Sequence, residues 1–119
     1  MADAIVLMDD FFFQAKLFET AKQTGTTLEL VTTGEQLVKS AALSPGALII
    51  VDLNARQGPL QAVETLAAPA SGNPRRVIAF LSHVQTDLAE RARAAGCQDV
   101  MPRSKFTQNL ADILRGAKS

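Results

Sequence analysis

Short apolar runs alternate with amphipathic stretches along this chain, and the alternation occurs five times. Apolar runs of about four to eight residues are typical of buried strands, whereas apolar residues that recur every three or four positions are typical of helices. The strands are expected at residues 4–8, 27–31, 47–51, 76–81 and 99–101. A predicted helix follows each strand, so the pattern indicates the α/β class.

Capping and turn residues indicate where the predicted helices begin and end. The first helix begins at Phe11 and ends at Thr24-Gly25. A capping box at residues 33–36 begins the second helix, which breaks at 44–46, and Pro59 lies in the first turn of a short third helix. Thr86 or Asp87 caps the fourth helix, which runs to Ala95 and is terminated by Gly96. Ser104 is the predicted N-cap of the last helix. In that last helix, Phe106, Leu110 and Leu114 have the spacing of a helix docked on a core.

The first helix carries apolar residues on two adjoining faces, which together predict a wide buried stripe. The residues on these faces are Phe11, Ala15 and Phe18, and Phe13, Leu17 and Ala21. Phe12 falls on the side of Lys16 and Glu19, so it is expected to be exposed.

Five βα units in this order predict a doubly wound, five-stranded parallel sheet with strand order 2-1-3-4-5 and five helices. The 119 residues suit a single domain over residues 1–119.

Composition narrows the possible partners and the expected location. Twelve Lys and Arg residues balance twelve Asp and Glu residues, and the basic residues are scattered, which argues against a nucleic-acid partner. No stretch is apolar enough to span a membrane and the N-terminus does not resemble a signal peptide, so a cytoplasmic location is expected. The single cysteine, Cys97, excludes an internal disulfide and a multi-cysteine zinc site.

Three aspartates follow the first and third strands, and they carry the candidate chemistry. Asp9 and Asp10 close the first apolar run, and Asp52 closes the third. In the predicted order these strands are neighbours, so the carboxylates converge at the edge where α/β proteins bind ligands. At about 5 Å they would repel by roughly 3 kcal/mol per pair at an effective dielectric near 20, so the cluster requires a cation or a raised pKa. Ser82 after the fourth strand and Arg103 after the fifth add a hydroxyl and a cation at the same edge.

These residues, in this order along the whole chain, resemble the receiver domain of bacterial two-component response regulators, which has a flavodoxin-like fold. The resemblance implies that Asp52 accepts a phosphoryl group and that Mg²⁺ binds directly to Asp10 and Asp52. It also implies that Asp9 lies near the ion through water and that the backbone carbonyl of Asn54 is a further ligand. Carboxylates, a carbonyl and retained waters are ligands that Mg²⁺ favours, and the ion offsets charge on a transferring phosphoryl group. Ser82 matches the hydroxyl that contacts the phosphoryl oxygen.

The chain departs from the family at three places. Arg103 stands at the usual lysine and Ser104 at the usual proline, and a planar guanidinium is not equivalent to an ammonium. Lys105 is a possible substitute, but Arg103 is preferred because Lys105 falls inside the predicted helix. The loop after Asp52 lacks the usual Met-Pro, and Val100 takes the place of the aromatic that often changes rotamer.

The leading hypothesis is a stand-alone receiver that takes a phosphoryl group on Asp52 in a Mg²⁺-dependent phosphorelay and signals through protein contacts. Its partners are then a histidine kinase or phosphotransfer protein and an unidentified downstream protein, which would contact the fourth and fifth strands and their helices. Such a domain is a signalling phosphoacceptor and not a metabolic enzyme. The alternative is a pseudo-receiver, an interaction module that does not use phosphorylation. A flavin protein is disfavoured because Asp9 and Asp10 would repel its phosphate, and a phosphohydrolase is disfavoured because no insertion could cover its substrate.

Overall fold

The elements follow one another as alternating strands and helices in a computed structural model that describes residues 2–66, 76–82 and 86–117. The strands are β1 (Ala4–Leu7), β2 (Leu28–Val31), β3 (Leu48–Asp52), β4 (Val77–Leu81) and β5 (Asp99–Pro102). The helices are α1 (Phe11–Thr24), α2 (Gly34–Leu43), α3 (Pro59–Leu66), α4 (Thr86–Ala95), α5 (Arg103–Gln108) and α6 (Leu110–Ala117). The predicted strands are confirmed within one residue at each end.

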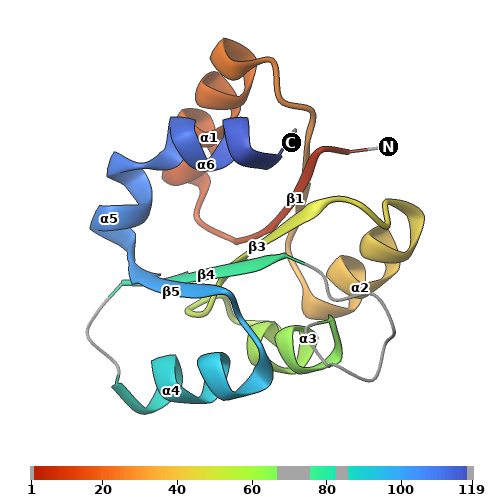
Figure 1. Cartoon of the computed structure of the whole chain (residues 1–119), viewed down its shortest axis with the longest axis vertical. Coiled ribbons are helices and arrows are strands. Elements are labelled where there is room, and N and C mark those ends of the chain that lie inside the picture. The colour runs from red at the N-terminus through yellow and green to blue at the C-terminus, as the bar shows by residue number, and fades with distance from the viewer. Residues whose placement is uncertain (1, 67–75, 83–85, 118–119) are drawn as a thin grey trace.

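All strands pair in parallel, in the order β2-β1-β3-β4-β5 (Figure 1). This is the predicted order. β1 and β3 are buried at every residue because helices cover both faces of the sheet, which is why their sequences are continuously apolar. In register, Leu7 pairs with Val51, so the residues that follow each strand emerge at one edge.

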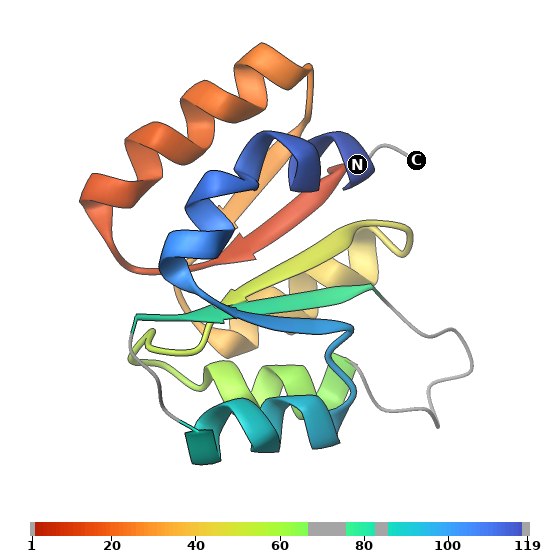
Figure 2. The same ribbon diagram turned by 60° about the vertical axis from the view of Figure 1, so that its left-hand side comes forward.

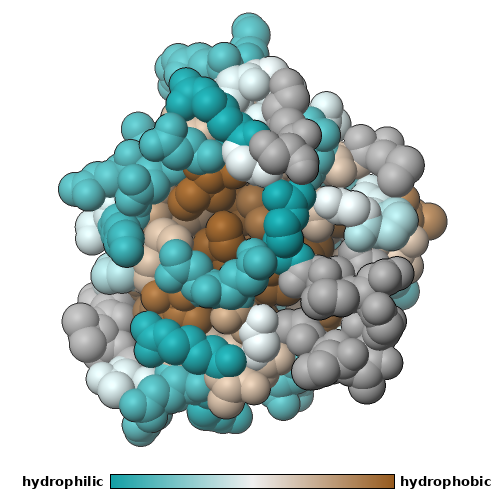
Figure 3. Space-filling model, viewed as in Figure 1, coloured by the Kyte–Doolittle hydropathy of each residue, from teal (hydrophilic) through white to brown (hydrophobic). Residues whose placement is uncertain are grey.

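Each face of the sheet has its own hydrophobic core. Helices α1, α5 and α6 lie on one face, and α2, α3 and α4 on the other (Figure 2). Side chains alternate along the strands, so Ile5 and Leu7 enter the core under α2 and α3, whereas Ala4 and Val6 enter the core under α1 and α6. Figure 3 shows apolar side chains at the centre of one side of the molecule, surrounded by hydrophilic ones.

The capping box predicted at α2 is present in modified form. Thr33 is the N-cap, and its hydroxyl accepts a hydrogen bond from the Gln36 backbone N–H at 3.1 Å. The Gln36 side chain reaches back to the backbone N–H of Thr32, one residue earlier than in the standard box. Gly96 ends α4 with φ +117°, as predicted.

The prediction for the last helix is wrong in two respects. Ser104 is not the N-cap of the last helix: α5 begins at Arg103, its N-cap is Pro102, and no side chain caps it. The single predicted helix is also two helices, separated at Asn109, so the described residues form six helices rather than five. The hydrophobic periodicity did not reveal this break, because the buried residues Phe106, Leu110 and Leu114 keep helical spacing across it.

The predicted buried stripe of α1 is half wrong. Leu17 and Ala21 are buried, and Phe13 packs against the same core. Phe11 and Phe18 are 81% and 44% exposed, because α1 meets the sheet and α6 along only one of its apolar faces. Phe12 is exposed as predicted.

No helix within the described residues is long and apolar enough to cross a membrane.

Candidate functional site

The candidate site lies at the carboxyl edge of the sheet, where β1, β3, β4 and β5 end. Asp9 and Asp10 follow β1, Asp52 is the last residue of β3, Ser82 follows β4, and Arg103 follows β5. Parallel pairing places all four strand ends on one edge, so residues distant in sequence become neighbours.

Asp10 has a structural role in addition to its place in the site. It is the N-cap of α1, with extended backbone, and its Oδ1 accepts hydrogen bonds from the backbone N–H groups of Phe12 at 3.0 Å and Phe13 at 3.3 Å. Its other oxygen, Oδ2, faces Arg103. The Arg103 guanidinium, aided by these backbone N–H groups, holds the pKa of Asp10 below its ordinary value.

Asp52 is the buried carboxylate of the site, with 2% of its surface exposed. Its Oδ1 accepts a hydrogen bond from the Asn54 backbone N–H at 2.9 Å. Burial raises the pKa of Asp52, and the hydrogen bond from Asn54 and the charge of Arg103 only partly oppose this effect. The nearby charge of Asp9 raises the pKa further.

Arg103 joins the two carboxylates. Its Nη1 lies 2.7 Å from Asp10 Oδ2 and its Nη2 lies 3.3 Å from Asp52 Oδ2. The guanidinium carbon also lies over the rings of Phe13 and Phe80, at 5.2 and 5.7 Å from their centroids. The basic residue that reaches the acids is therefore Arg103, whereas Lys105 is exposed.

Asp9 is bound differently from the other two aspartates. Its Oδ2 accepts a hydrogen bond from the Arg56 backbone N–H at 3.1 Å, which ties the end of β1 to the loop between β3 and α3. Asp9 therefore helps to shape this loop, and it adds negative charge near Asp52.

Ser82 and Asn54 form a contact that sequence reasoning missed. Ser82 is exposed, and its backbone N–H donates to the Asn54 side-chain Oδ1 at 2.6 Å. The sequence prediction assigned Asn54 only through its backbone carbonyl. The position of Asn54, two residues after the end of β3 and beside the end of β4, is the signal that could have suggested a bridge between these loops.

The fit of a Mg²⁺ ion depends on which carboxylate oxygens face open space. The donor chemistry suits Mg²⁺, but no three His, Cys, Asp or Glu side chains of the described residues are grouped so as to hold a metal ion. In both Asp10 and Asp52 the Oδ2 atom faces Arg103, and the Oδ1 atom accepts a hydrogen bond from a backbone N–H group. As these side chains lie, they fit a guanidinium and not a divalent ion. The expected Mg²⁺ site at Asp9, Asp10, Asp52 and the Asn54 carbonyl stays a prediction.

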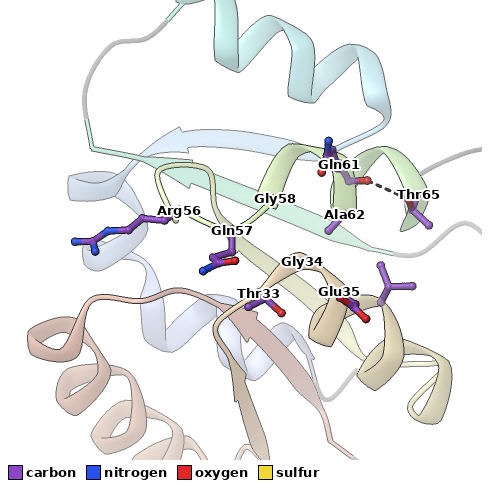
Figure 4. A pocket seen from close by; sticks show the side chains of 10 residues that line it. Thr33, Gly34, Glu35, Arg56, Gln57, Gly58, Gln61, Ala62 and Thr65 are labelled. Carbon is purple, nitrogen blue, oxygen red and sulfur yellow. Dashed lines mark hydrogen bonds between the residues drawn. The ribbon is translucent and has the colours of Figure 1, made fainter.

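An open cleft of about 570 Å³ lies beside this site and not within it. It is formed by the starts of α2 and α3 and the loop before α3, with Thr33, Glu35 and Gln61 among its lining residues (Figure 4). None of the three aspartates lines it. In Figure 4 the Arg56 side chain points away from the other labelled side chains.

The chemistry available at the edge is that of one buried carboxylate beside one fixed cation. A carboxylate oxygen is a nucleophile toward a phosphoryl group, and a guanidinium is matched in shape and charge to phosphoryl oxygens. At this edge Asp52 is the buried carboxylate and Arg103 is the cation beside it.

Neither a protein-family model nor a curated protein matches this sequence. Solved structures of response regulators are nevertheless similar to it. A response regulator from Hahella chejuensis has a TM-score of 0.77 at 19% identity, covering 96% of this chain and 92% of that one. A signal receiver domain from Bermanella marisrubri has a TM-score of 0.76 at 16% identity, covering 100% of both chains.

The N-terminal domain of a response regulator/sensory box/GGDEF protein from Carboxydothermus hydrogenoformans has a TM-score of 0.70 at 21% identity, over 96% of this chain and 91% of that one. Identities this low concern the fold, and the sheet order and the near-complete coverage agree with it. The chain therefore has the fold of a response-regulator receiver domain.

Proposed function

We propose that this chain works as a phosphorelay receiver, in which Asp52 accepts a phosphoryl group from a histidine kinase or phosphotransfer protein. The observation that carries the proposal is the buried Asp52 carboxylate paired with the Arg103 guanidinium at the open edge of a receiver fold. A histidine-bound phosphoryl group is the expected donor because the resemblance to receivers implies it. We also propose a cytoplasmic location, where such kinases present their phosphohistidine.

The transfer is a substitution at phosphorus. A carboxylate oxygen of Asp52 attacks the phosphorus atom, the phosphorus–nitrogen bond of the phosphohistidine breaks, and the imidazole leaves with the electron pair and takes up a proton. Charge develops on the phosphoryl oxygens during this step, and we expect Arg103, the cation beside Asp52, to stabilise it. The product is an aspartyl phosphate, so the chain is a phosphoacceptor and not a metabolic enzyme.

The output is proposed to pass through the ends of β4 and β5. The Asn54 backbone N–H donates to Asp52, and the Asn54 side chain accepts a hydrogen bond from the Ser82 backbone N–H, so we expect a change at Asp52 to reach the end of β4 through Asn54. Val100, at the position of the aromatic switch, is buried in β5. The output is therefore proposed to depend on the end of β4 rather than on an aromatic rotamer.

The pseudo-receiver is the second candidate, and one specific observation favours it. Arg103 pairs with both Asp10 and Asp52, which gives the acids a cation without any ligand. In that case the fold presents a constant surface to its partner and Asp52 is not modified.

Intact mass spectrometry separates the two candidates. The protein is incubated with Mg²⁺ and a small phosphodonor such as acetyl phosphate, and again with EDTA in place of Mg²⁺. The receiver proposal expects one added phosphoryl group on the wild type, none on Asp52→Asn, and an unchanged gain on Asp112→Asn, a control in the exposed pair with Arg115. A mass gain that persists in Asp52→Asn would favour the pseudo-receiver. So would the absence of any gain on the wild type.

A further inference from the structure

The space between Asp10 and Asp52 is occupied by a side chain of this chain. One planar guanidinium presents Nη1 to one carboxylate at 2.7 Å and Nη2 to the other at 3.3 Å. Each carboxylate therefore has its Oδ2 engaged by Arg103, while its Oδ1 accepts a hydrogen bond from the backbone. A lysine ammonium carries its charge at one point, whereas the two arms of Arg103 contact both carboxylates at once.

Aromatic packing helps to hold the guanidinium in this position. It lies over Phe13 from α1 and Phe80 from β4. Phe80 in turn stacks on Phe106 with ring centroids 4.3 Å apart, and Phe106 is fully buried in α5. Arg103 is the first residue of that helix, so the packing of α5 directs its side chain into the site.

The inward position leaves one polar atom without a partner. Among the described residues, the Arg103 Nε is a buried side-chain donor without a hydrogen-bond partner. An unpaired buried donor disfavours this position relative to one in water. The ion pairs with Asp10 and Asp52 oppose this cost.

We propose that Arg103 is the resident cation of this site and competes directly with divalent ions for Asp10 and Asp52. Mg²⁺ then binds only when the guanidinium leaves the two carboxylates, and the wild type binds it weakly. Competition between Arg103 and Mg²⁺ does not depend on phosphoryl transfer, so its test omits any phosphodonor.

The test is a titration with Mg²⁺ followed by NMR, using the backbone amides of residues 9–13 and 52–54. Arg103→Gln is expected to bind Mg²⁺ at least about tenfold more tightly than the wild type, because the competing charge is gone. Lys105→Gln is the matched control, since it removes one positive charge from the same helix at an exposed position. It is expected to leave Mg²⁺ affinity within about twofold of the wild type.

A second measurement on the wild type keeps the proposal testable if Arg103→Gln does not fold. The Nε–H signal of Arg103 is expected to move toward the position of a solvent-exposed arginine as Mg²⁺ saturates the site. Equal Mg²⁺ affinity in the wild type and Arg103→Gln would overturn the proposal. So would Mg²⁺ binding at residues 9–13 and 52–54 with the Arg103 Nε–H signal unchanged, or no binding to either protein.

Discussion

Two aspartates that share one arginine have opposite pKa shifts, because they differ in burial. The side chain of Asp10 is 30% exposed and that of Asp52 is 3% exposed. Water still solvates Asp10, so Arg103 and the backbone N–H groups lower its pKa. Asp52 is shielded from solvent, and the effect of burial, which raises its pKa, outweighs that of the same arginine, which lowers it. The charged form of Asp52 is thus maintained at a cost in stability.

Asp52→Asn is expected to raise Tm by about 2 to 5 °C at pH 7. A carboxyl group whose folded pKa is raised lowers stability as pH rises through that pKa, and an amide of the same shape avoids this loss. The gain should therefore disappear at a pH below 3.8, the unfolded-state value, where Asp52 is neutral in both states. Thermal unfolding by circular dichroism measures it; a lower Tm for Asp52→Asn at pH 7 would contradict the argument.

Asp10→Asn is expected to have the opposite pH dependence. Asparagine remains a good N-cap, so the substitution removes the charge but keeps the cap of α1. At pH 7 it should cost at most about 1 kcal/mol, through the lost pair with Arg103 and the lost charge at the helix N-terminus. A lowered pKa confers stability above the unfolded pKa of 3.8 that is lost as pH falls through the folded value. Urea unfolding at pH 7 and at pH 2.5 checks this, and a cost that does not shrink at the lower pH would refute it.

At the scale of elements, the close approach of α2 to the loop before α3 is set by one glycine. The backbone N–H of Gly34 donates to the Gln57 carbonyl at 2.7 Å. A Cβ atom at position 34 would clash with the carbonyl oxygen of Gly58 and lie 3.2 Å from the Cβ of Ala62. The nearest obstacle is backbone, so it cannot rotate away, and α2 reaches α3 because residue 34 lacks a side chain.

Gly34→Ala is expected to destabilise the fold by about 1 to 3 kcal/mol, because α2 and the loop before α3 must move apart. Gly116→Ala is the matched substitution within α6, where an added Cβ meets nothing within 4 Å. It should stabilise by about 0.5 to 1 kcal/mol, because alanine is the better helix former. Guanidinium chloride unfolding of both variants gives the comparison. Equal effects of the same sign would show that the contact with Gly58 does not control the packing of α2.

At the scale of the whole molecule, one sheet separates two cores, and each strand contributes side chains to both. Val6 lies in the core under α1 and α6, and Leu7 lies in the core on the other face. The two cores cannot lose their packing independently, because unpairing a strand exposes both faces. Cooperative unfolding of the whole domain is the consequence.

Phe106→Ala tests this coupling. Phe106 is fully buried under α5, so its truncation should cost about 3 to 5 kcal/mol. If the cores are coupled, the denaturant midpoint falls equally for amide signals of Leu17 in α1 and Leu37 in α2, on opposite faces of the sheet. A midpoint that falls for Leu17 alone would mean that the two faces unfold separately. Phe12→Ala is the control, because Phe12 is 94% exposed and its loss should change stability by less than about 0.5 kcal/mol.

Apart from the break in the last helix, the sequence alone was sufficient to predict the alternation of strands and helices, the order of the strands and the edge at which Asp9, Asp10, Asp52 and Arg103 meet. These properties follow from local periodicity and from the rules for right-handed parallel connections, and neither requires knowledge of distances across the fold. The resemblance to receiver domains rested on the same residues, and it is confirmed at the level of the fold.

Only the tertiary structure decided which neighbours the side chains meet. Periodicity assigned two apolar faces to α1, but the sheet and α6 cover one, so Phe11 and Phe18 remain exposed. The requirement for a cation could be inferred from three nearby carboxylates. That the guanidinium of Arg103 bridges Asp10 and Asp52 depends on the packing of α5 against Phe13 and Phe80, which brings together residues far apart in the chain.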